Sequence, residues 1–156
     1  PTTAFRCVAA AYFVRGERMT HSLRGARQRG VSIRSLLPGK HTDSESVRLA
    51  SKHECGRLLA AGVQMHEYQP TMIHNKMLIA DGELVSVGST NFDMRSFQLN
   101  EEVSLFLLDE GSVGSLESLQ LEYLETSDMI DLDQWRRRGK PTMFAENIAR
   151  LVSPLL

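Results

Sequence analysis

The first 69 residues alternate two kinds of hydrophobic pattern, and this alternation constrains the fold more than any other feature of the chain. Three short runs have the apolar or alternating pattern of strands: 7–13, 31–37 and 63–69. Two longer runs between them have helical spacing and are closed by a glycine, at Gly30 and Gly62: 17–30 and 44–61. Strand, helix, strand, helix, strand is the order of parallel βαβ units, so the pattern predicts an α/β fold.

After residue 70 the pattern changes to paired strands and then to helices. Two alternating runs, 74–79 and 83–88, are separated by Asp81-Gly82, a dipeptide typical of a type I′ hairpin turn, which needs positive φ at both positions. Residues 102–108 are apolar on both faces, which predicts a central strand. Three helices are expected beyond residue 109: 112–129, 131–139 and 142–152. We therefore expect a single domain over 1–156, with a mixed β-sheet flanked by helices on both faces.

The composition excludes several classes of protein. Apolar residues make up 42% and charged residues 24%, as in a globular domain. Eighteen basic and nineteen acidic side chains give a net charge of -1, so no overall positive field attracts nucleic acid, and an anionic ligand must be held by local groups. Cys7 and Cys55 have no zinc-site spacing and are expected to be reduced structural thiols. No apolar run is long enough for a membrane span and no secretory signal begins the chain, which starts at Pro1 and is expected to be a piece of a longer protein.

Polar side chains cluster where the hairpin begins and ends. Because side chains at i and i+2 of a strand share a face, His74 and Lys76 are expected to point the same way, about 7 Å apart. Ser89 and Asn91 follow the second strand, and the turn returns the end of that strand to the start of the first. An imidazole, an ammonium, a hydroxyl and a carboxamide are therefore predicted to converge.

These four groups suit attack on a phosphodiester. A neutral imidazole, with an ordinary pKa of about 6.5, is a competent nucleophile at physiological pH. The Lys76 ammonium would neutralise a phosphoryl oxygen, while Ser89 and Asn91 would donate hydrogen bonds to it. With the lysine supplying positive charge, we expect no metal and no cofactor.

Each residue alone also has an ordinary explanation. A single histidine at the start of a strand is most often structural or merely exposed, Asp81 is explained by hairpin chemistry, and Ser89 and Asn91 are common turn residues. The joint pattern is what favours chemistry: H-x-K-x-x-x-x-D followed seven residues later by G-S-x-N-x-D.

"HNKMLIAD" with "GSTNFD" resembles the HKD signature of the phospholipase D superfamily. Neighbouring segments from "AAYFVRGERM" through "NFDMRSFQLNEEVSL" to "ARLVSPLL" resemble, in order, the C-terminal half of bacterial cardiolipin synthases. The resemblance covers nearly the whole chain. It makes His74, Lys76 and Asp81 the catalytic motif and Lys76, Ser89 and Asn91 the phosphate-binding groups. Asp81, in its tight turn, is expected to order the hairpin rather than to contact substrate.

The resemblance also implies a mechanism. Two such motifs face each other in that superfamily, one histidine forming a phosphohistidine while the other protonates the leaving alcohol. Glu102 falls where a carboxylate hydrogen-bonds the motif histidine, although without the resemblance it is simply an acid at the edge of a strand. The implied reaction transfers the phosphatidyl group of one phosphatidylglycerol to a second, forming cardiolipin and releasing glycerol. Water must be excluded, because hydrolysis of the intermediate gives phosphatidic acid.

The resemblance implies an enzyme at the bacterial inner membrane, with its catalytic domain peripheral at the membrane surface. Several arginines, at 24, 27, 29, 34 and 136–138, are candidates for contact with anionic headgroups, although a solvated surface explains each more simply.

The chain departs from the family pattern in having a single H-x-K motif, since no other histidine has a lysine two residues on. A second HKD-bearing half, in cis or from a homodimer mate, must supply the other histidine. Two alternatives remain open: a single-motif homodimeric phosphodiesterase that cuts nucleic acid, disfavoured by the near-neutral charge, and an inactive lipid-binding fragment, disfavoured because every motif residue is present. A chain with half a site is also expected to expose an apolar patch and to associate.

Overall fold

A computed structural model describes residues 7–10, 13–14, 17–42, 45–93, 100–139 and 146. Its main sheet has seven strands, in this order: β8 (Ser104–Leu107), β6 (Leu84–Gly88), β5 (Lys76–Ala80), β1 (Cys7–Ala10), β3 (Arg34–Pro38), β4 (Gln64–Tyr68) and β9 (Ser127–Met129). The β1, β3 and β4 strands are parallel, and every other neighbouring pair is antiparallel. A separate parallel pair joins β2 (Phe13–Val14) to β7 (Phe92–Asp93). The mixed sheet is as predicted.

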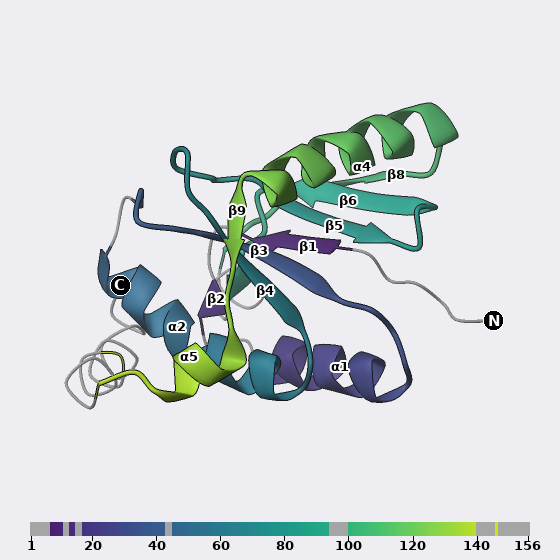
Figure 1. Cartoon of the computed structure of the whole chain (residues 1–156). Helices are drawn as coiled ribbons and strands as arrows, with labels where there is room; N and C mark the ends of the chain where they lie inside the picture. The colour runs from purple at the N-terminus through teal and green to yellow at the C-terminus, as the bar shows by residue number, and fades with distance from the viewer. Residues whose placement is uncertain are drawn as a thin grey trace.

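Helices cover both faces of the sheet, as expected. They are α1 (Glu17–Gln28), α2 (Glu45–Ala60), α4 (Glu110–Glu125) and α5 (Leu132–Arg136). The α4 helix packs on one face, against β4, β6 and β9, while α1, α2 and α5 lie on the other side (Figure 1). The α4 helix begins at Asp109, whose carboxylate accepts a hydrogen bond from the Ser112 backbone N–H at 2.8 Å. This bond lowers the pKa of Asp109.

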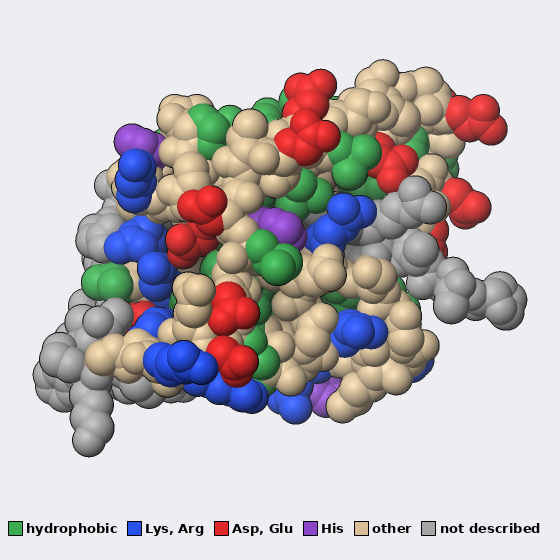
Figure 2. All heavy atoms as spheres, viewed as in Figure 1, with side chains coloured by type: hydrophobic (Ala, Val, Ile, Leu, Met, Phe, Trp, Pro, Cys, Tyr) green, Lys and Arg blue, Asp and Glu red, His purple; other side chains and the backbone are tan. Residues whose placement is uncertain are grey.

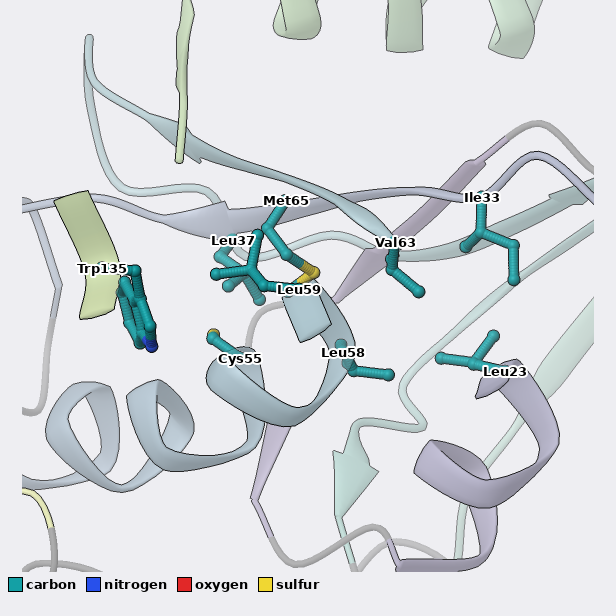
Figure 3. Packing of buried hydrophobic residues seen from close by; sticks show 9 residues of the cluster. All are labelled: Leu23, Ile33, Leu37, Cys55, Leu58, Leu59, Val63, Met65 and Trp135. Carbon is teal, nitrogen blue, oxygen red and sulfur yellow. The ribbon is translucent and has the colours of Figure 1, made fainter. Parts of the chain in front are cut away.

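Two hydrophobic clusters form the core, one on each face of the sheet. The first joins α1, α2 and α5 to β3 and β4, with Leu58 and Met65 fully buried and Trp135 of α5 packed at one end (Figure 3). The second lies under α4, where Val113 meets Ile79 and Val85. Burial raises the pKa of the free Cys55 thiol to about 12, as expected of a structural cysteine. The side chain of Cys7 lies outside the described part of the chain.

Local turn chemistry was predicted correctly. Asp81 and Gly82 have φ of 55° and 71°, and they join β5 to β6 as the dipeptide indicated. Gly30 and Gly62, the expected helix C-caps, also have positive φ, at 91° and 86°.

Four predictions concern the second half of the chain, one strand and three helices. The strand predicted at 102–108 is present as β8, but the prediction that it is central is wrong, because β8 forms one edge of the seven-stranded sheet. The helix predicted over 112–129 ends with α4, and its last three residues form β9 at the opposite edge. The helix predicted at 131–139 is confirmed as the shorter α5. The one predicted at 142–152 lies outside the described residues, apart from Glu146.

Candidate catalytic site

The hairpin brings its two polar ends together. The β5 and β6 strands pair antiparallel with Met77 opposite Val87, so the end of β6 lies beside the beginning of β5. Ser89 and Asn91 follow β6, while His74 lies two residues before Lys76, the first residue of β5. The geometry thus agrees with the antiparallel return on which the predicted site depends.

Gly88 allows a third strand to approach this end of the hairpin. A Cβ at Gly88 would lie 2.1 Å from the Val103 carbonyl oxygen and 2.8 Å from the Ser104 Cα. No side chain fits within those distances, so only glycine lets β8 pair here. The glycine of the G-S-x-N segment therefore positions the segment around Glu102 against Ser89.

Ser89 is held by hydrogen bonds to that segment. Its hydroxyl donates to a carboxylate oxygen of Glu102 and accepts from the Val103 backbone N–H at 3.0 Å. The Ser89 backbone N–H donates to the Val103 carbonyl oxygen at 2.9 Å. The Asn100 side-chain amide donates to the other oxygen of Glu102 at 3.3 Å. Sequence reasoning missed the contact between Ser89 and Glu102, because nothing local in the sequence pairs residues thirteen positions apart.

His74 and Lys76 form the other side of the site. The His74 side chain is exposed, so a ligand can reach its imidazole. The Lys76 ammonium donates to the His74 carbonyl oxygen at 2.9 Å, which draws the positive charge back toward the start of the strand. The expected contact of Glu102 with the imidazole stays a prediction.

Asp81 lies at the other end of the hairpin. It is five residues beyond Lys76, and with a strand rise of about 3.3 Å per residue the separation is about 16 Å. Asp81 is exposed and has the positive φ that the turn requires. At that distance it cannot contact a phosphate held at Lys76, so a role in ordering the turn remains the prediction.

A hollow of about 420 Å³ opens beside Lys76 on the sheet face away from α4. It is lined by apolar side chains that include Leu78, Leu84 and Phe106, and by three hydroxyl-bearing residues: Ser86, Thr90 and Ser104. Volumes of this size are usual for small-molecule sites. No local sequence pattern indicates this hollow, because its walls come from separate elements, mainly α1, β5, β6 and β8.

Several of the arginines considered for headgroup binding have structural contacts. Arg27 donates from Nε to the Gly62 carbonyl oxygen at 3.0 Å, beyond the end of α2. Arg138 stacks 3.4 Å from the centre of the Trp135 ring and forms a 2.7 Å ion pair with Glu146. Lys and Arg side chains gather along the side that carries α2 and α5, at the lower left of Figure 2. This side lies away from β6 and β8 (Figure 1).

Within the described ranges, no three His, Cys, Asp or Glu side chains lie close enough together to hold a metal ion. None of the helices in the same part of the chain has the length and hydropathy needed to cross a bilayer.

The fold is that of phospholipase D-like proteins. It resembles the crystal structure of Nuc, a phospholipase D family member from Salmonella typhimurium, with a TM-score of 0.69 and 17% sequence identity over 83% of this chain and 84% of that one. It also resembles the phosphatidylserine synthase of Haemophilus influenzae Rd KW20, with a TM-score of 0.75 and 11% identity over 97% of this chain and 39% of that one.

The sequence narrows this class to one family. Residues 4–120 match the family described as "Cardiolipin synthase, PLD-like domain", and the chain belongs to that family. It is 41% identical over 149 residues to a cardiolipin synthase of Geobacillus kaustophilus (strain HTA426), covering 96% of this chain and 30% of that protein. It is 36% identical over 145 residues to cardiolipin synthase A of Erwinia tasmaniensis, covering 93% of this chain and 30% of that protein. The chain thus spans about three tenths of the length of these relatives.

Proposed function

We propose that this chain supplies one wall of the active site of a phosphatidyltransferase that makes cardiolipin from two phosphatidylglycerols. The proposal rests on the membership of the chain in the cardiolipin synthase family. The chain is 41% identical to one such enzyme, and the aligned region includes the H-x-K and G-S-x-N segments. The exposed imidazole and neighbouring ammonium of His74 and Lys76 support the same chemistry.

The reaction runs through a covalent intermediate. One of two histidines, His74 and its counterpart in a second half, attacks phosphorus while the bond to the glycerol oxygen breaks. The other histidine gives its proton to the departing glycerol. It then accepts the proton of a hydroxyl on the second phosphatidylglycerol, which attacks phosphorus as the phosphorus–nitrogen bond breaks.

The remaining polar groups stabilise charge on the phosphoryl oxygens. Lys76 provides a cation, and Asn91 and Ser89 are hydrogen-bond donors. Ser89 has one hydroxyl proton, which in the free protein is donated to Glu102. We infer that binding of a phosphate competes for this proton, and that Glu102 sets the orientation of the hydroxyl.

The second histidine requires a second half, which we place in the same longer polypeptide. About seven tenths of the length of the relatives lies outside the matched region, which is long enough to contain a second half. The exposed edge of the sheet at β8 is evidence that another part of the enzyme packs against it. Four large apolar side chains there are 58% to 76% exposed: Val103, Leu105, Phe106 and Leu108. An exposed apolar edge strand beside Ser89 is a surface that folded proteins normally cover.

We further propose that the enzyme works at the surface of a bacterial inner membrane, where its phospholipid substrates lie. The names of the relatives support this placement, because cardiolipin is a phospholipid.

The identity of the products tests the function. The full-length protein is incubated with phosphatidylglycerol vesicles, and cardiolipin, glycerol and phosphatidic acid are measured. Cardiolipin and glycerol in equal amounts, with little phosphatidic acid, is the expected result. Phosphatidic acid as the main product indicates a hydrolase, and cleavage of DNA or RNA without cardiolipin indicates the nuclease alternative. Either outcome contradicts the proposal.

A further inference from the structure

The sheet face opposite α4 is only partly covered. The core on that side joins α1, α2 and α5 to β3 and β4, and among the described residues Leu78 is the only contribution from β5, β6 or β8. Leu78 shares its face with Lys76, because side chains alternate along β5, while Met77 and Ile79 point to the α4 side. Over β6 and β8, therefore, this face is left open at the hollow described above.

The hollow has a polar and an apolar part. Lys76 brings one positive charge to it, and Thr90 and Ser104 lie within 3.2 Å of each other, their hydroxyl oxygens hydrogen-bonded. Elsewhere its walls include the side chains of Leu84 and Phe106. A ligand that fits such a surface carries an anion at one end, ester or hydroxyl oxygens next to it, and hydrocarbon beyond.

We propose that this hollow binds the glycerol ester backbone and the first methylenes of an acyl chain of the phospholipid whose phosphate lies at His74 and Lys76. The inference rests on the proposed function and adds a subsite that selects for a diacyl substrate. Lys76 connects the two sites, since it lines the hollow and also donates to the His74 carbonyl oxygen. The Lys76 ammonium pairs with the phosphate charge. Because one of the Thr90 and Ser104 hydroxyls donates to the other, the remaining hydroxyl proton is available to an ester oxygen of the ligand.

Size and charge favour this occupant over others. About 420 Å³ lies within the range of small-ligand sites but holds only part of a diacyl phospholipid, so the remaining methylenes stay in the membrane. A lipid in the hollow also removes water from around Lys76, which protects a covalent phosphatidyl intermediate from hydrolysis.

Filling the hollow tests the subsite. Ser86 lines it from the middle of β6, and Ser86→Phe in the full-length protein adds a ring inside it. Glu83→Phe is the matched control, because exposed Glu83 lies in the turn just before the same strand. The kcat/KM is measured with dihexanoyl phosphatidylglycerol below its micellar concentration and with glycerophosphoglycerol, its deacylated analogue.

We expect Ser86→Phe to reduce the ratio of diacyl to deacylated kcat/KM by about tenfold, the effect of losing contact with one to two methylenes. Glu83→Phe should leave that ratio unchanged. Leu84→Ala, which keeps the hollow open but removes apolar surface, should raise KM for the diacyl substrate more than for the deacylated one. Melting curves establish that each variant is folded. If Ser86→Phe does not fold, the ratio of diacyl to deacylated kcat/KM in Leu84→Ala tests the subsite instead.

An unchanged ratio in folded Ser86→Phe or in Leu84→Ala overturns the subsite and leaves the proposed function standing, provided that the wild type makes cardiolipin. This result would mean that the acyl part of the substrate does not contact the hollow. A wild-type protein that makes no cardiolipin overturns the proposed function, and with it the subsite.

Discussion

The hydroxyl of Ser89 donates a hydrogen bond to the carboxylate of Glu102, thirteen residues further along the chain, while the backbone of Val103 pairs with Ser89 from the same segment. The carboxylate thus lies at the end of the hairpin that also carries His74 and Lys76. A bond to an ionised acceptor is stronger than a neutral one, so Glu102 fixes the direction in which the Ser89 proton points.

Removing the charge of Glu102 should therefore reduce activity. Glu102→Gln keeps the shape of the side chain but makes the bond to Ser89 neutral, and we expect kcat/KM for phosphatidylglycerol in the full-length protein to fall about 10- to 100-fold, corresponding to about 1.4–2.7 kcal/mol. The neighbouring Glu101→Gln is the control, because Glu101 is exposed and precedes the segment that pairs with Ser89. Equal activities of the two variants would remove Glu102 from the site.

The close approach at Gly88 predicts a large effect of one added methyl group. Gly88→Ala places a Cβ against the Val103 carbonyl oxygen, and we expect it to lower the free energy of unfolding by about 1–3 kcal/mol through strain between β6 and β8. Gly114→Ala is the matched control, since a Cβ there meets nothing within 4 Å and Gly114 lies inside α4. It should raise the free energy of unfolding by about 0.5–1 kcal/mol.

Urea unfolding of the purified 156-residue chain measures both changes. A Gly88→Ala protein as stable as the wild type would show that β8 does not pair at this position.

The exposed β8 edge should make the isolated chain associate. Leu105→Lys puts a charge on this edge, and we expect it to weaken self-association at least about tenfold, or about 1.4 kcal/mol. Met129→Lys is the control, because Met129 is similarly exposed, at 64%, but lies on β9 at the opposite edge. Sedimentation equilibrium of the two variants distinguishes the edges. A wild-type chain that stays monomeric at high concentration contradicts the prediction.

His66 should make stability depend on pH. Burial lowers its pKa below 6.5, and the nearby Arg34 guanidinium lowers it further. Neither ring nitrogen has a hydrogen-bond partner within the part of the chain that the structure describes. The unfolded state therefore binds a proton at a higher pH than the folded state does. The contribution of His66 to stability is present above about pH 6.5 and is lost as the pH falls toward its folded pKa.

His66→Gln removes this titration. We expect the free energy of unfolding of the wild type to decrease more steeply between pH 7 and pH 5 than that of the variant, as measured by urea unfolding across this range. Parallel pH profiles would show that His66 titrates alike in both states.

The sequence predicted the elements whose cause is local. Asp81-Gly82 specifies its own turn, because few other dipeptides adopt positive φ twice, and the βαβ rhythm of the first 69 residues follows from hydrophobic spacing. The strand at β9 was missed because Ser127, Asp128 and Met129 have no strand pattern of their own and extend only because β4 lies beside them.

The position of β8 shows a different limit. Its apolar residues on both faces were interpreted as a central strand, yet the same pattern also suits an edge that another part of a longer polypeptide covers. Local patterns also do not predict the contact between Ser89 and Glu102 or the hollow beside Lys76. Both form only when elements that are separate in the sequence pack together.

The participation of His74 in phosphatidyl transfer is the central claim about this protein. The most direct measurement is the rate of cardiolipin formation by full-length His74→Ala in phosphatidylglycerol vesicles, beside His21→Ala, which removes an exposed histidine on α1. We predict that His74→Ala loses at least about 10³-fold in kcat, because no other group replaces the imidazole, and that His21→Ala keeps the wild-type rate. Cardiolipin formation by His74→Ala at the rate of His21→Ala would contradict the account.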